Sequence, residues 1–254
     1  GCGPRRTGLS ALPNVVLLSL DTTRADHMSC FGYPRLTTPN LDGLAGQSLF
    51  FTRALTTSSW TLPSHATMFT GKFVTSHGAR KVEEGAHSLS EAFGPKQQGD
   101  LYRVSTVSPD ELLLAEILRD AGYATGAVVA GPWLKKQFGL ARGFDYHDDQ
   151  NIEGLDFKQK RIGMEVTVRA IEWLKKIESK PFFLFLNYFD AHTPYVFPNQ
   201  FLDVFKEQPV PTLLEIDQKE YDISLNFMDW SIGALLKNLK ETSRYDNTLI
   251  VVVG

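Results

Sequence analysis

Residues 14–21 read NVVLLSLD, an almost unbroken apolar run that ends in a carboxylate. The run follows Pro13 and contains two valines, which is typical of a buried strand in a parallel sheet covered on both faces. Similar runs follow at residues 124–130, 182–188 and 248–253. Segments with helical periodicity lie between them, at residues 112–121, 160–177 and 221–239. Strands that alternate with helices predict an α/β fold with a mostly parallel central sheet sandwiched by helices.

Shorter features are expected between these segments. We predict a helix over residues 41–46, a strand at residues 49–52, and a helix that begins near residues 61–64 and stops at Gly71. A loop is predicted at residues 143–152. Residues 75–103 and 194–214 are predicted to be irregular surface insertions that would shape the substrate site.

The composition is that of an ordinary globular chain. Its 254 residues are 43% hydrophobic and carry a net charge of −3, with the charges scattered, which argues against a nucleic-acid partner. No apolar stretch is long enough for a transmembrane helix. The two cysteines, Cys2 and Cys30, are too few for a disulfide framework or a cysteine-rich zinc site.

Residues 1–13 are predicted to form an N-terminal tail. The start, Gly1-Cys2-Gly3, resembles the end of a bacterial lipoprotein signal, in which Cys2 would carry a lipid. An arbitrary fragment boundary is the simpler interpretation. We expect a periplasmic or extracellular protein that contacts a membrane only if Cys2 is lipidated.

Polar side chains follow two of the predicted strands. Asp21 follows the first, and Asp190 and His192 follow the third. The carboxyl ends of parallel strands share one edge, where ligands bind. Asp21 could hold a hard divalent cation there, or it could cap the next turn. His192 could bind an anion or protonate a leaving group, or it could be a hydrogen-bonded loop histidine.

A second cluster surrounds Thr61, which lies at the predicted start of a helix, where backbone N–H groups favour an anion. A metal bound to the Thr61 hydroxyl would lower its pKa and make it a nucleophile. The alternative is that Thr61 or Ser64 is a simple N-cap. His65 and His77 could be catalytic or merely hydrogen-bonded, and Lys72 could pair with an anion or be solvated.

The order of these motifs resembles the sulfatase family of the alkaline-phosphatase-like superfamily. Residues 14–27 resemble the family's opening signature. Residues 61–65 (TLPSH) and 70–72 (TGK) resemble its nucleophile motif, which is Cys or Ser, any residue, Pro, Ser and Arg, followed by Thr-Gly-Arg or Thr-Gly-Lys. Further matches lie at residues 32–34, 38–42, 121–125, 143–145, 181–183, 192–195 and 245–251. Residues 14–254 are therefore predicted to be the N-terminal, incomplete part of a sulfatase-like catalytic domain.

The resemblance implies an alkaline-phosphatase-like fold, truncated in this chain, and one divalent cation, usually calcium. It implies Asp21 as a metal ligand, Thr22 as a lost or weakened one, and Thr61 as both nucleophile and ligand. It also implies supporting or anion-binding roles for a second group of residues: His65, Lys72, His77 and His192.

The departures from the family pattern are informative. Thr22 stands where many members have a second aspartate, and His65 stands where the motif's arginine steadies the nucleophile. Thr61 replaces Cys or Ser, so no formylglycine is expected. The family places an Asp-His or Asp-Asn metal pair just after the last strand, where this chain ends at Gly254. We therefore expect an incomplete metal site and an inert chain in isolation.

The Thr61 side chain also changes the expected chemistry. Formylglycine hydrate releases sulfate by C–O cleavage, whereas a threonine ester must be attacked by water at sulfur or phosphorus. Phosphorus tolerates this attack when a metal and cationic groups are near, while the family resemblance favours sulfate. We expect a metal-dependent hydrolase of sulfate or phosphate esters, acting on a small molecule or glycan. The alternatives are a phosphoryl-headgroup transferase with the same nucleophile, or a non-catalytic binding protein that kept the fold.

Overall fold

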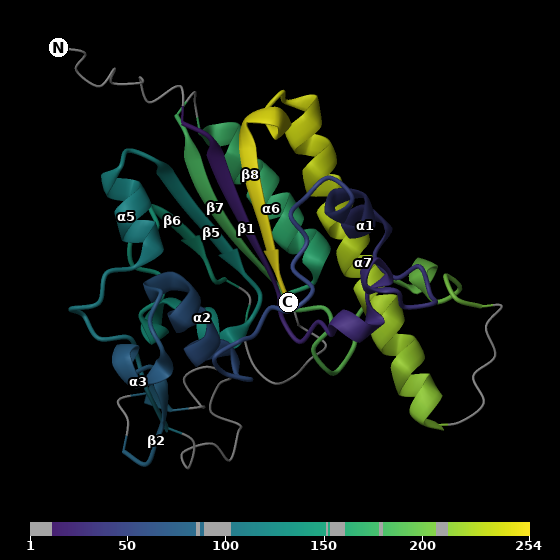
Figure 1. Cartoon of the computed structure of the whole chain (residues 1–254), viewed down its shortest axis with the longest axis horizontal. Helices are drawn as coiled ribbons and strands as arrows, with labels where there is room; N and C mark the ends of the chain where they lie inside the picture. Colours follow the sequence, from purple (N-terminus) through teal and green to yellow (C-terminus); the bar gives the residue numbers. More distant parts are fainter. Residues whose placement is uncertain are drawn as a thin grey trace.

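The structure is a computed structural model, and it describes residues 12–84, 87–88, 103–150, 152, 161–177, 180–206 and 213–254. Within these residues, the main element is a five-stranded sheet whose neighbouring strands are all parallel (Figure 1). The strand order is β6 (Tyr146–Asp148), β5 (Ala124–Val129), β7 (Phe182–Tyr188), β1 (Asn14–Leu20) and β8 (Thr248–Val253). The predicted α/β class with a parallel central sheet is confirmed.

Helices cover both faces of this sheet (Figure 1). Alternate side chains of β1 point to opposite faces, so Val16 and Leu18 pack in one core cluster and Leu17 in another. The first cluster includes side chains of α6 (Gly163–Lys176) and α7 (Leu213–Glu241), and the second includes those of α2 (Thr61–Thr70) and α5 (Leu114–Asp120). The predicted helices at residues 112–121, 160–177 and 221–239 are therefore present, with shifted ends.

Smaller elements complete the described chain. α1 (Pro39–Ala45) packs against α7, and α3 (Val74–His77) follows α2. A three-stranded antiparallel sheet has the order β2 (Arg80–Val82), β4 (Arg103–Ser105) and β3 (His87–Ser88). The single-turn 3-10 helices are Ala25–His27, Ser29–Phe31, Pro132–Leu134, Lys136–Phe138, Asn199–Phe201 and Tyr245–Asn247. Of the helices described here, none is both long and apolar enough to cross a membrane.

Three sequence expectations were wrong in detail. The strand expected at residues 49–52 is not formed; Leu49 and Phe51 are 89% and 73% exposed, and the segment pairs with no strand in the described part of the chain. The loop expected at 143–152 contains β6, whose residues Tyr146–Asp148 carry no apolar run. The insertion expected at 75–103 is partly ordered, because it supplies strands of the small sheet. Residues 85–86 and 89–102 of that insertion lie outside the described residues.

The strand ends place the polar residues at one edge, as predicted. β1 runs into Asp21, whose backbone N–H donates a 2.9 Å hydrogen bond to the carbonyl oxygen of Tyr188, the last residue of β7. β8 pairs with β1 up to Ser19 and Val253. The ends of β1, β7 and β8 therefore converge next to Asp21, and Figure 1 shows the C-terminus at this end of β8.

Candidate active site

Asp21 and Thr61 lie side by side at this edge. Thr61 is the first residue of α2, and its hydroxyl Oγ1 donates a 3.2 Å hydrogen bond to Oδ2 of Asp21. Asp21 is held in place because β1 ends immediately before it and its N–H is bound to β7. The structure thus brings together the two residues that the sequence predicted as nucleophile and metal ligand, although their roles stay predictions.

The start of α2 suits an anion. Trp60 occupies the N-cap position in an extended conformation and makes no capping side-chain hydrogen bond. The Ser64 hydroxyl donates to the carbonyl of Thr61 at 3.0 Å, so it acts inside the first turn and not as the cap. The free N–H groups of a first helical turn carry partial positive charge that favours a negative ligand. A substrate oxyanion beside Thr61 would meet this charge.

His65 supports the backbone of Thr61 and not its hydroxyl. Its Nδ1–H donates to the carbonyl oxygen of Thr61 at 2.7 Å, because a carbonyl can only accept. Its Nε2 is then the acceptor for the hydroxyl of Ser19, 2.8 Å away. Burial lowers the pKa of His65 to about 4, which keeps the ring neutral at pH 7. His65 therefore fastens the first turn of α2 to strand β1.

Thr22 has a strained backbone and a committed hydroxyl. Its φ is 57°, in the left-handed region that a β-branched residue rarely adopts. Its Oγ1 donates a 2.7 Å hydrogen bond to the carbonyl oxygen of Asp21. The hydroxyl that stands at the family's second aspartate position is thus bonded to the backbone, and the predicted weakening of this metal ligand stays a prediction.

Lys72 and His77 lie beyond the far end of α2. The ammonium of Lys72 pairs with the carboxylate of Glu111 at 2.6 Å. His77 is fully buried, accepts the N–H of Ala79 at Nδ1 (3.1 Å), and places Nε2 3.1 Å from the hydroxyl of Thr67. Burial lowers the pKa of His77. These contacts join both residues to Glu111, Thr67 and Ala79 and not to Thr61, and their predicted anion-binding roles remain predictions.

His192 follows β7 at the edge shared with Asp21. Its Nδ1–H donates to the carbonyl oxygen of Thr193 at 2.6 Å, and its ring stacks on Phe189 with centroids 4.3 Å apart. This stacking fixes the ring plane, and the side chain is only partly buried. His192 therefore lies at the same edge of the sheet as Asp21, and its contact with a substrate anion stays a prediction.

The oxygen atoms of Asp21 and Thr61 fit a hard cation but do not complete its shell. Calcium takes six to eight oxygen ligands. Among the described residues, no group of three or more His, Cys, Asp or Glu side chains is arranged to hold a metal ion. The end of β8 lies close to Asp21. Ser19 pairs with Val253, and a Cβ atom on Gly254 would lie 3.3 Å from the carbonyl oxygen of Thr23.

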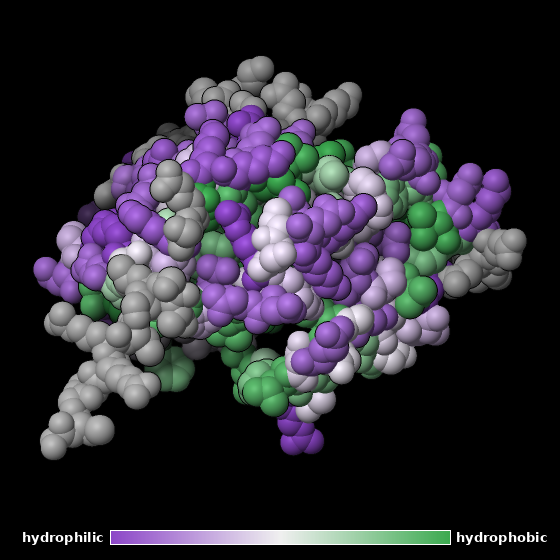
Figure 2. All heavy atoms as spheres, turned by 90° about the horizontal axis from the view of Figure 1, so that it is seen from above, coloured by the Kyte–Doolittle hydropathy of each residue, from purple (hydrophilic) through white to green (hydrophobic). Residues whose placement is uncertain are grey.

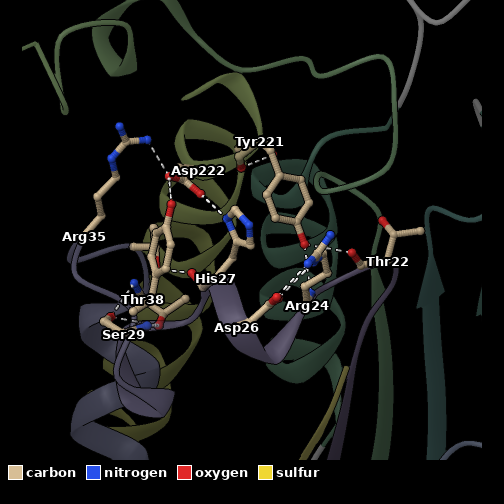
Figure 3. A network of polar contacts seen from close by, with 12 residues as sticks. Thr22, Arg24, Asp26, His27, Ser29, Arg35, Thr38, Tyr221 and Asp222 are labelled. Carbon is tan, nitrogen blue, oxygen red and sulfur yellow. Dashed lines mark hydrogen bonds and ion pairs between the residues drawn. The ribbon is translucent and has the colours of Figure 1, made fainter. Parts of the chain in front are cut away.

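A network that sequence reasoning missed surrounds the turn after Asp21 (Figure 3). Tyr221 donates its hydroxyl to the carbonyl of Thr22 at 2.9 Å and accepts the N–H of Arg24 at 2.8 Å. The next residue, Asp222, is fully buried and binds the loop over residues 27–35. The only sequence signal was that polar residues recur on α7 at helical spacing.

The fold and the site define a class of hydrolase-like α/β proteins, with a hydroxyl at a helix start facing a carboxylate at a strand end. Residues 13–254 match the family model described as Sulfatase, and the chain belongs to the sulfatase family. The family and the alkaline-phosphatase-like fold expected from the motifs are thereby confirmed.

The similar proteins include a sulfatase, a member of the alkaline phosphatase superfamily and a phosphonate monoester hydrolase. The chain is 24% identical over 284 residues to human N-acetylgalactosamine-6-sulfatase, covering 98% of this chain and 50% of that protein. It is 27% identical over 245 residues to a multifunctional alkaline phosphatase superfamily protein of Trinickia caryophylli, covering 82% and 47%. The crystal structure of the phosphonate monoester hydrolase of Agrobacterium radiobacter superposes with a TM-score of 0.71 at 19% identity, covering 94% and 62%. The chain thus spans about half the length of these two curated relatives.

Proposed function

We propose that the protein is a metal-dependent hydrolase of sulfate or phosphate esters with Thr61 as its nucleophile. The observation that carries the proposal is the 3.2 Å contact between Thr61 Oγ1 and Asp21 Oδ2 at the uncapped start of α2. A divalent cation at these oxygens would act as a Lewis acid and lower the pKa of the hydroxyl. Family membership supports the reaction class, because sulfatases and a phosphonate hydrolase share the fold.

The residues of the chain then have distinct tasks. The Thr61 oxygen would attack sulfur or phosphorus and lose its proton to solvent, while a protonated His192 would give its proton to the leaving alcohol. Water would then attack the same sulfur or phosphorus atom and give a proton back to His192, and the released Thr61 oxygen would regain a proton from solvent, with sulfate or phosphate as product. His65 holds the first turn of α2 still throughout, because its two hydrogen bonds join Thr61 to β1.

The remaining metal ligands are proposed to follow Gly254. β8 is in register with β1, so the next two positions would emerge beside Asp21. The resemblance places an acidic residue paired with histidine or asparagine there, and such a pair would bring the shell nearer to the number that calcium takes. Calcium, a glycan or small-molecule substrate, and a lipid on Cys2 are parts of this proposal; Cys2 lies outside the described residues.

The test is to assay the full-length protein with 4-nitrophenyl sulfate and 4-nitrophenyl phosphate. Thr61→Ala is expected to abolish hydrolysis of whichever ester the protein accepts, while Thr61→Ser retains part of it. Thr242→Ala, directly after the C-terminal end of α7, is the matched control. Full activity of Thr61→Ala on both esters would contradict the nucleophile assignment. A folded wild-type protein that turns over neither ester, but binds them, would favour the non-catalytic alternative.

A further inference from the structure

The turn after Asp21 needs support from outside itself. Thr22 has a φ of 57°, and a β-branched residue keeps this strained conformation only when its surroundings impose it. Thr22 directly follows Asp21, and its Oγ1 donates a 2.7 Å hydrogen bond to the carbonyl oxygen of Asp21. Whatever holds Thr22 in place therefore also restrains the backbone of Asp21.

One side-chain hydroxyl holds both ends of this turn. The Tyr221 hydroxyl donates to the carbonyl oxygen of Thr22 at 2.9 Å and accepts the N–H of Arg24 at 2.8 Å. Its ring is almost fully buried and packs edge-on against His27, with centroids 5.1 Å apart. A buried ring fixes the position of its hydroxyl, so the bridge is rigid and not an incidental surface contact.

The neighbouring carboxylate holds the rest of the loop (Figure 3). Asp222 accepts hydrogen bonds from Nδ1 of His27 at 2.8 Å, from the Tyr33 hydroxyl at 2.7 Å and from Arg35 at 2.7 Å. It is fully buried, so these three partners compensate for the loss of water around its charge. The loop over residues 27–35 is thus fixed on α7, next to the residue whose hydroxyl binds Thr22 and Arg24.

The contact continues along one face of α7. Asn226 binds the carbonyls of Leu36 and Thr37, and Asp229 accepts the backbone N–H groups at the start of α1. A Cβ atom on Gly233 would collide with the side chain of Asn40 at 2.6 Å. Residues 222, 226, 229 and 233 follow the i, i+4, i+7, i+11 spacing of a single helix face. This face of α7 contacts the segment from His27 to the start of α1, and Tyr221, one position before it, contacts Thr22 and Arg24.

We propose that Tyr221 is a positioning residue that sets the Asp21 turn in the conformation that binds the divalent cation. The inference rests on the proposed function, because it assumes that Asp21 is a metal ligand. Tyr221 does not touch the reacting atoms; it acts through the backbone of Thr22 and Arg24. Asp222 holds the following loop on α7 through its hydrogen bonds to His27, Tyr33 and Arg35.

Tyr221→Phe tests the inference because it removes the hydroxyl and keeps the ring. The full-length variant is compared with Tyr245→Phe, a tyrosine before β8 at the opposite end of the sheet. We expect backbone amides in residues 21–27 to exchange hydrogen faster in Tyr221→Phe, since Arg24 N–H loses its acceptor. The Kd for Ca²⁺ or Zn²⁺, measured by calorimetry, is expected to rise about tenfold when two hydrogen bonds are lost, and excess cation should restore kcat.

The outcomes separate this inference from the proposed function. Tyr221→Phe with wild-type cation affinity, alongside an Asp21→Asn variant that has lost it, overturns the positioning role and leaves the proposed function standing. Asp21→Asn with wild-type cation affinity contradicts the proposed metal site itself. Weaker cation binding in Tyr221→Phe with unchanged affinity in Tyr245→Phe supports the inference, provided that both variants melt near the wild-type temperature. Loss of affinity in both tyrosine variants counts against it.

Discussion

Ser19 on β1 and His65 on α2 are joined by a 2.8 Å hydrogen bond between the serine hydroxyl and Nε2. The other ring nitrogen of His65 binds the carbonyl oxygen of Thr61. The strand that ends at Asp21 and the helix that starts at Thr61 are therefore fastened to each other within a few ångströms of the candidate site. Relative movement of the two elements would have to break these bonds as well as the contact between Asp21 and Thr61.

Because His65 is neutral in the folded protein, the free energy of unfolding is expected to depend on pH in mildly acidic solution. Burial lowers its pKa to about 4 in the folded protein, against about 6.5 in the unfolded chain. Between these values the unfolded chain binds more protons, so stability is lost as pH falls from 6.5 to 4. The shift corresponds to about 3 kcal/mol. His65→Gln is expected to flatten this part of a plot of the free energy of unfolding against pH.

The measurement is urea unfolding at several pH values between 7 and 4. His147, whose pKa burial also lowers to about 4, is expected to contribute a similar loss, so the variant should keep part of the slope. An unchanged slope in His65→Gln would show that the histidine is not neutral in the fold.

Asp21→Asn is expected to remove the activity and its dependence on metal together. A cation supplies several kcal/mol of charge stabilisation, so we expect kcat/KM to fall on the order of 100-fold or more. The wild-type protein should lose its activity to EDTA and recover it with Ca²⁺ or Zn²⁺. Asp120→Asn, a surface aspartate on α5, is the control. Metal-stimulated activity at the wild-type level in Asp21→Asn would remove Asp21 from the site.

The two ends of the Arg24 to Asp222 network differ in burial, which predicts different costs. Asp222→Asn removes a fully buried charge that faces Arg35 and His27, and we expect a loss of about 3 kcal/mol in the free energy of unfolding. Asp26→Asn breaks an ion pair with Arg24 in which both side chains are 64% exposed, so at most about 1 kcal/mol is expected. Chemical unfolding of the two variants measures both; equal losses would contradict the role assigned to burial.

Replacing Gly126 in β5 with alanine is expected to disturb the packing between the sheet and α6. A Cβ atom there would lie 2.7 Å from the indole ring of Trp173 on α6. Gly126→Ala is expected to cost about 1–3 kcal/mol, because the ring must shift in a packed core. Gly43 in α1 has nothing within 4 Å of its added Cβ, so Gly43→Ala should be neutral or stabilise by up to about 1 kcal/mol. Thermal melts of both variants decide whether the helix and sheet are packed as described.

The sequence allowed the main sheet to be predicted because β1, β5, β7 and β8 are apolar runs long enough to show their burial. β6 was missed because three residues, Tyr146–Asp148, are too few for a pattern. The strand expected at residues 49–52 had the right composition but finds no partner strand in the described part of the chain. Strand composition alone does not identify a partner.

The candidate site was predictable in part. Asp21 and Thr61 each follow a recognisable signal, a strand end and a helix start, and the fold brings them together. Ser19 and Tyr221 carry no such signal. Their contacts with His65 and Thr22 span 46 and 199 positions, and nothing in the local sequence marks a pair so far apart. Long-range partners of this kind come only from the packed structure.

The hydrogen bond between Tyr221 and Thr22 joins two residues that the ribosome synthesises at different times. At roughly 5–20 residues per second, the ribosome adds the 199 positions between these residues in about 10–40 s. Until α7 has emerged, the nascent chain contains Asp21 and Thr61 but lacks the tyrosine that holds the Thr22 turn. The candidate cation site is therefore expected to acquire its final shape late, so that a partly made chain would neither capture metal tightly nor act prematurely on esters.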